Sequence, residues 1–131
     1  MDLIRCPQSS DDDGLLISSS EYNSLVSGVL KNTIDWVSRK ADPTAESLSS
    51  LNNKVAVLMS VSPGALGGLC GLVTVRSILS NINGLVLPKQ IAVGKATEAF
   101  SPDGNLKDEK QRASVEQLGA LLAKMIIKLK V

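Results

Sequence analysis

Histidine is absent from the 131 residues of this sequence. That absence removes the commonest general base, the usual nucleophile triads and most zinc sites in one step. Only two cysteines occur, Cys6 and Cys70, and neither has a second cysteine or a histidine at metal-ligand spacing, so we expect two free thiols and no metal site. If the chain takes part in catalysis, a bound cofactor is expected to carry the chemistry.

The sequence also lacks long apolar runs and an excess of charge. Its longest apolar run, 55–59, falls far short of the roughly 18 residues that a membrane-spanning helix needs. Acidic residues at 11–13 stand where a secretory signal would be basic and then apolar, so we expect a cytoplasmic protein. Lysine and arginine number 14 against 13 aspartates and glutamates, which gives no bulk attraction to nucleic acid or to an anionic membrane.

Short apolar segments predict three strands. The length and an apolar fraction of 44 % fit one globular domain. Unbroken apolar runs at 14–19 and 54–61 are typical of strands covered on both faces. The third segment, 85–93, contains Pro88, which cannot donate a ladder hydrogen bond, so we expect a short edge strand centred on 91–93.

Helices are predicted between and after these strands. Apolar residues recur every three or four positions over 26–37, 72–82 and 107–129, and Ser24 or Ser27 can cap the first of these helices. Strands that alternate with amphipathic helices predict an α/β fold, in which a parallel sheet lies between two helical layers.

Ligands of such sheets bind beyond the carboxyl ends of the strands. Two loops fit that position, 18–27 and 61–68. The second loop has three glycines and leads into a helix, which permits close approach of its backbone to a flat ligand. A turn that needs glycine only for strand-to-helix geometry accounts for the spacing equally well.

Longer motifs point to a family. Ser-Glu-Tyr-Asn at 20–23, Gly-Val-Leu-Lys-Asn-Thr-Ile-Asp-Trp at 28–36 and the Ser-x-Gly-x-x-Gly-Gly loop at 62–68 resemble the signature of NAD(P)H-dependent FMN reductases and the related quinone and chromate reductases. The agreement continues in Arg76 and in the Asp-Gly-Asn-Leu turn at 103–106, and it covers about residues 14 to 127.

This resemblance implies a flavodoxin-like three-layer fold, with FMN as cofactor and NAD(P)H as co-substrate. It implies transfer of hydride from nicotinamide through FMN to a quinone, a metal oxyanion or free flavin, so the flavin and no side chain would carry the reaction. A homo-oligomer, dimer or tetramer, is expected. The cofactor-binding residues carried over by motif are Ser20, Glu21, Tyr22, Asn23, Ser62, Gly64, Gly67 and Gly68.

The sequence also departs from the family. Serines at 20 and 27 replace its usual prolines, and Leu25 replaces a common small residue. The strand and Gly-Ser-x-Arg-type loop that hold the FMN phosphate have no counterpart before Gly14. We therefore expect a disordered or extended segment at 1–13, followed by an N-terminally truncated flavodoxin-like domain at 14–131.

The missing phosphate loop leaves two other functions open. The chain can be a non-catalytic homologue that acts as an oligomerising or interaction subunit, its exposed sheet edge covered by a partner copy. A flavodoxin-like electron carrier that ignores nicotinamide is a further reading, which the lack of an acidic balance disfavours.

Overall fold

The structure is a computed structural model, and it describes residues 13–39, 44, 48 and 51–129. The predicted N-terminal segment, apart from Asp13, and Cys6 lie outside the described residues. The strands are β1 (Gly14–Ser19), β2 (Glu21–Tyr22), β3 (Leu25–Val26), β4 (Val55–Val61) and β5 (Leu85–Val93). The helices are α1 (Gly28–Val37), α2 (Leu69–Asn81), α3 (Ala96–Ala99) and α4 (Glu109–Leu129).

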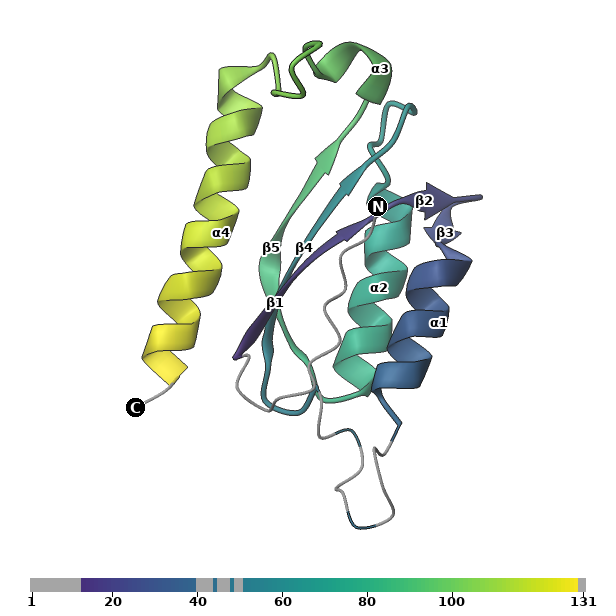
Figure 1. The fold of residues 1–131 in the computed structure, drawn as a ribbon, viewed down its shortest axis with the longest axis vertical. Helices are drawn as coiled ribbons and strands as arrows, with labels where there is room; N and C mark the ends of the chain where they lie inside the picture. Colours follow the sequence, from purple (N-terminus) through teal and green to yellow (C-terminus); the bar gives the residue numbers. More distant parts are fainter. Residues whose placement is uncertain (1–12, 40–43, 45–47, 49–50, 130–131) are drawn as a thin grey trace.

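The main sheet is parallel and has the order β1-β4-β5. Helices α1 and α2 cover one face and α4 covers the other, which gives the three layers seen in Figure 1. The predicted α/β class and its flavodoxin-like layering are thus confirmed. The sequence did not predict the small β2–β3 hairpin or α3, because both are too short to produce a periodic pattern.

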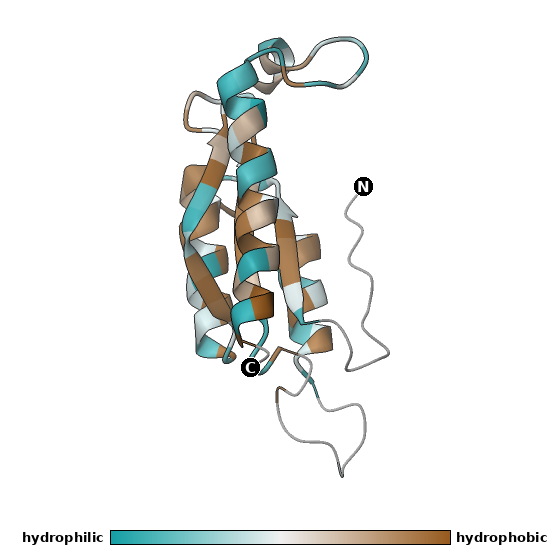
Figure 2. Ribbon diagram, turned by 90° about the vertical axis from the view of Figure 1, so that its left-hand side faces the viewer, coloured by the Kyte–Doolittle hydropathy of each residue, from teal (hydrophilic) through white to brown (hydrophobic). Residues whose placement is uncertain are grey.

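The two faces of the sheet have separate cores. The face under α1 and α2 buries residues of both helices and of β4: Leu30, Ile34, Ala56, Leu58, Leu72, Val75 and Leu79. The other face buries Val55, Val57, Leu87 and Leu118, the last of these from α4. Figure 2 looks at the sheet from the α4 side and shows apolar strand segments on both sides of that helix.

Strand β5 lies at an edge, as expected, but the expectation that it is short was wrong. It runs for nine residues from Leu85. Between the Ala56–Val86 and Leu58–Gln90 pairs, β5 holds more residues than β4, and this irregularity accommodates Pro88. The strand can therefore continue through a residue that has no N–H.

Local signals set the ends of both central helices. The Ser27 hydroxyl accepts a hydrogen bond from the Leu30 N–H at 3.2 Å and caps α1, whereas Ser24 lies in a turn. Helix α2 ends where Asn83 takes a φ of 65° and the Gly84 N–H donates to the Leu79 carbonyl at 2.9 Å. The Ser27 cap sets where α1 begins after the loop that follows β1, and the turn at Asn83 and Gly84 leads from α2 into β5.

Candidate functional site

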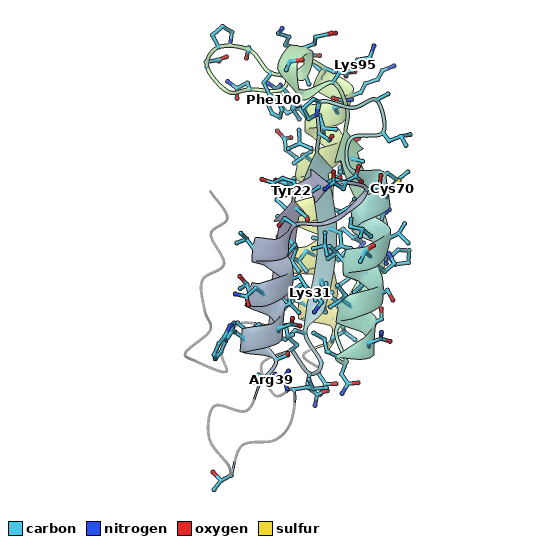
Figure 3. All side chains as sticks on the ribbon, turned by 90° about the vertical axis from the view of Figure 1, so that its right-hand side faces the viewer. Tyr22, Lys31, Arg39, Cys70, Lys95 and Phe100 are labelled. Atoms are coloured by element: carbon cyan, nitrogen blue, oxygen red, sulfur yellow. The ribbon has the colours of Figure 1, made fainter. Side chains whose placement is uncertain are left out.

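Two loops lie side by side at the carboxyl ends of β1 and β4. The first, 20–26, contains the β2–β3 hairpin, and the second, 62–68, is the glycine loop. Because β1 and β4 are neighbours in the sheet, their following loops meet at one edge of it. In Figure 3, Tyr22 and Cys70 lie near this edge, while Lys31 and Arg39 lie toward the other end of the molecule.

The first loop is a tight hairpin. Asn23 and Ser24 connect β2 to β3 with φ values of 52° and 64°. Two successive positive φ angles are typical of a type I′ turn, which asparagine tolerates well. The turn presents Tyr22 with 64 % of its surface exposed, and Ser20 and Asn23 are exposed as well. The hairpin therefore offers an aromatic side chain and polar groups on a stiff support.

Glu21 ties this hairpin to the helix behind the glycine loop. Its Oε2 accepts a hydrogen bond from the Gly71 N–H at 2.7 Å, in the first turn of α2. That N–H has no partner inside the helix, and a carboxylate there also complements the helix dipole. The structure gives Glu21 this capping contact, and its predicted contact with a cofactor stays a prediction.

Two of the three loop glycines are needed for the path of the backbone. Gly67 and Gly68 have φ values of 63° and 88°, which other residues rarely adopt. A Cβ at Gly67 would come within 2.6 Å of the Gly94 nitrogen and the Val93 carbonyl carbon. Both glycines are buried. That they contact the cofactor directly, as the family motif implies, stays a prediction.

Backbone hydrogen bonds join the glycine loop to the end of β5. The Ser62 N–H donates to the Val93 carbonyl, the Lys95 N–H to the Gly64 carbonyl, and the Ala96 N–H to the Ser62 carbonyl, each at 3.1 Å. The loop is thus held by backbone hydrogen bonds to the residues at and just after the end of the neighbouring strand.

Ser60 adds a support that the sequence interpretation missed. Its buried hydroxyl donates to the Gly67 carbonyl at 2.7 Å, across the base of the loop. The sequence signal that could have found this support is a polar residue within the apolar run of β4, because a buried hydroxyl needs a hydrogen-bond partner. The sequence interpretation also missed Gly94. A Cβ at this position would lie 2.4 Å from the Ala65 carbonyl oxygen, so the loop packs closely against this glycine.

Gly64 differs from the other two loop glycines because its open side faces no close neighbour. A Cβ at Gly64 would meet only the Ser62 hydroxyl, at 3.7 Å. Among the described residues, no acceptor binds the N–H groups of Ala65 and Leu66, the next two residues of this exposed tip. A flat ligand with carbonyl oxygens can therefore approach the backbone here.

No group of three or more histidine, cysteine, aspartate or glutamate side chains in the described part of the chain is placed to hold a metal ion. Cys70 is an exposed free thiol, and no described helix is long and apolar enough to cross a membrane. An open pocket of about 680 Å³ lies at the amino ends of β4 and β5, away from the two loops.

A parallel sheet between helical layers, with a hairpin and a glycine loop at its carboxyl edge, defines a flavodoxin-like α/β protein. The sequence profile described as NADPH-dependent FMN reductase matches residues 7–98. The chain belongs to this family, whose cofactor and co-substrate are FMN and NAD(P)H, and the resemblance seen in the motifs is confirmed.

Individual relatives agree with this assignment. An NAD(P)H-dependent FMN reductase of Pseudomonas aeruginosa is 32 % identical over 106 residues, which cover 80 % of this chain and 54 % of the relative. The NADH:(hydroxy)cinnamate reductase subunit CrdA of Vibrio ruber is 28 % identical over 89 % of this chain and 57 % of its own length. The solved structure of FerB, a flavoenzyme NAD(P)H:(acceptor) oxidoreductase from Paracoccus denitrificans, matches with a TM-score of 0.73 and 25 % identity, over 91 % of this chain and 63 % of that one.

The chain thus spans a little over half the length of the curated relatives described above. Its resemblance lies in the part that carries the hairpin, the glycine loop and the two helices behind them.

Proposed function

We propose that this chain binds the ring system of FMN at the hairpin and glycine loop and acts as an NAD(P)H-dependent flavin oxidoreductase. Hydride would pass from the nicotinamide to the flavin, and electrons would go on to a quinone, a metal oxyanion or free flavin. The observation that carries this proposal is the exposed tip at Gly64, where the N–H groups of Ala65 and Leu66 have no acceptor among the described residues, on a loop that backbone hydrogen bonds join to the end of β5. We keep the cytoplasm as the expected location.

The residues of the site fit a flavin ring. FMN, when bound, supplies the hydride-accepting chemistry, which no side chain of this histidine-free chain has to provide. The N–H groups of Ala65 and Leu66 would donate to ring carbonyl oxygens and so favour negative charge on the reduced ring. Tyr22, on the neighbouring hairpin, would cover part of the ring and limit the access of water.

The relatives support the proposed chemistry at the level of the family. Their names include FMN reductase, (hydroxy)cinnamate reductase subunit, 2-hydroxy-1,4-benzoquinone reductase and quinone reductase. Each of these names describes a reductase or a reductase subunit, and the names differ in the compound that is reduced. We therefore propose that this chain transfers hydride from the nicotinamide to the flavin. The acceptor would belong to the class of quinones, metal oxyanions and flavins.

A titration of the purified protein with FMN tests the proposal. The flavin's visible absorbance reports binding, and its bleaching by NADPH reports hydride transfer. Gly64→Leu places a side chain on the open tip, and we expect it to weaken FMN binding at least about 10-fold. Gly119→Leu is the matched control, because a Cβ at Gly119 in α4 meets nothing within 4 Å.

Two results would contradict the flavin proposal. One is the absence of saturable FMN binding by the wild-type chain. The other is equal binding by the Gly64→Leu and Gly119→Leu variants, which would place FMN elsewhere. Riboflavin in a parallel titration shows whether the phosphate adds affinity, and we expect a difference below about 3-fold if the ring supplies most of the binding.

A non-catalytic interaction subunit is the second candidate function. The observation that favours it is the uncovered apolar surface of α1, where Val29 and Trp36 stand two turns apart with 68 % and 73 % of their surfaces exposed. Large exposed apolar residues in one stripe are typical of contact surfaces. This candidate predicts an oligomer that stays colourless with FMN, which the same titration distinguishes.

A further inference from the structure

The pairing between β4 and β5 is irregular in the middle of β5. In the described register, β5 pairs with β4 at 85–86 and again at 90–93, and the residues at 87–89 have no partner there. Pro88 lies among them and has no N–H with which to extend the ladder. Residues that such an irregularity leaves unpaired disrupt the ladder locally. The ladder is therefore weakest between the two paired parts of β5.

The Arg76 side chain spans this irregularity from α2. Its guanidinium donates to the Val86 and Pro88 carbonyls, both at 3.3 Å, and to the Gln90 Oε1 at 2.9 Å. The three acceptors thus lie before, within and after the unpaired residues. A planar guanidinium presents its N–H groups as a rigid fork, which suits several acceptors at once. Arg76 forms no ion pair with any described residue, so its described hydrogen bonds all go to β5.

The glycine loop is attached to both of the elements that Arg76 joins. At one end the loop leads directly into α2. At the other end, the Ser62 N–H donates to the Val93 carbonyl, and the Ala96 N–H donates to the Ser62 carbonyl, both at 3.1 Å. The Lys95 N–H donates to the Gly64 carbonyl at the same distance. A shift of the second paired part of β5 relative to α2 would therefore displace the tip of the loop.

We propose that Arg76 is a positioning residue for the glycine loop. By bridging the irregularity of β5, its guanidinium holds the end of this strand in place against α2 and so sets the position of the exposed tip at Gly64. Arg76 acts through β5, and it need not touch a ligand. The effect on the loop can be measured without a ligand, and only the effect on FMN binding rests on the proposed function.

Two substitutions should move the loop in opposite directions. Arg76→Met removes every N–H donor of the side chain and keeps an apolar stem on α2. Gln90→Glu replaces the amide oxygen that Arg76 binds by a carboxylate, and a charge-assisted hydrogen bond is stronger than a neutral one. Arg112→Met is the matched control, because Arg112 is exposed on α4 and its Nε lies 3.9 Å from the Glu116 Oε1.

Amide hydrogen exchange tests the inference on the ligand-free chain. The reporters are the three N–H groups that join the loop to the end of β5, those of Ser62, Lys95 and Ala96, and the reference is the N–H of Val57 in the middle of β4. Arg76→Met should speed exchange at the reporters at least about 10-fold more than at the reference. Gln90→Glu should slow exchange at the reporters about 3-fold, and Arg112→Met should leave all four rates unchanged.

Three exchange results overturn the inference. They are reporter rates that Arg76→Met does not change, an increase that is as large at Val57 as at the reporters, and faster reporter exchange in Gln90→Glu. The last of these decides the matter even if Arg76→Met does not fold.

A titration with FMN adds a second readout. Arg76→Met should weaken FMN binding about 5-fold, and Arg112→Met should not weaken it. If the wild-type chain binds FMN, equal affinity of the wild type and Arg76→Met also overturns the inference. If the wild-type chain binds no FMN, the proposed function fails, and the exchange rates alone decide the role of Arg76.

Discussion

The two faces of the sheet show how differently one set of strands can be covered. Two helices, α1 and α2, enclose the first face, and their buried side chains interlock with β4. A single helix of 21 residues covers the second face, and Leu118 is its one fully buried side chain among the described residues. Both faces have a core, but α4 buries fewer of its side chains against the sheet than α1 and α2 do.

This difference has a functional meaning because the candidate site belongs to the better-packed face. The hairpin contacts α2, and Glu21 binds its first turn. The glycine loop leads directly into the same helix. Rigid supports of this kind give a binding site precision.

The largest effect is expected from cavities in the two cores. Leu72→Ala on the α2 face should lower the free energy of unfolding by about 3 to 4 kcal/mol, and Leu118→Ala on the α4 face by about 2 kcal/mol. Both side chains are fully buried helical leucines, but α4 can settle toward the sheet more easily. Urea denaturation measures both losses. Equal losses, or a larger one at Leu118, would contradict the proposed difference between the faces.

A smaller loss is expected when the hairpin is released from α2. Glu21→Ala removes the acceptor of the Gly71 N–H and should cost about 1 kcal/mol of folding stability. Glu116→Ala is the control, because Glu116 is exposed and its nearest cation, the Arg112 Nε, lies 3.9 Å away. If thermal melts show the same midpoint for both variants, Glu21 does not secure the helix.

The looseness of α4 can be probed by overpacking. A Cβ at Gly14 would lie 2.5 Å from the Ile126 Cδ1 and 3.1 Å from the Leu122 Cδ1, the flexible tips of two α4 side chains. We expect Gly14→Ala to cost less than about 1 kcal/mol, since these tips and the helix can move. Gly119→Ala, in open space on the same helix, should be neutral or stabilising. A chemical-denaturation cost near 3 kcal/mol for Gly14→Ala would show a rigid α4.

The smallest effect concerns the turn that leads from α3 to α4. The Ser101 hydroxyl and the Asn105 side-chain amide donate to the Asp103 carboxylate, and these hydrogen bonds lower the pKa of Asp103 from its ordinary value. A lowered folded-state pKa means that the stabilisation is present above the unfolded value and is lost as the pH falls through the folded value. Carbon-detected NMR titration should show this low pKa, and Asn105→Ala should raise it.

Much of the fold could be predicted from the sequence because its signals were strong. The unbroken run that became β4 and the helical stripes of α2 and α4 needed no tertiary information. Strand β5 was longer than predicted, since a proline signal cannot show that an irregular register absorbs the proline. The hairpin depends on positive φ angles at Asn23 and Ser24, which the short polar stretch did not reveal.

The sequence predicted where the candidate site lies, but only part of how its residues are held in place. Motifs located both loops, and parallel pairing of β1 and β4 brings them together. They could not show that Glu21 binds α2, because its partner Gly71 lies 50 residues away. They also could not separate Gly64 from Gly67, since the difference arises from the backbone of residues 93–94 packed against one and not the other.

The hydrogen bonds between the glycine loop and the end of β5 have a consequence for how this protein can evolve. They use main-chain atoms of Ser62, Gly64, Val93, Lys95 and Ala96, so the outline of the loop does not depend on which side chains its tip carries. Pro63, Ala65 and Leu66 are exposed there and can be exchanged without reshaping the support. The side chains at the tip can therefore change by point substitution with little penalty for folding.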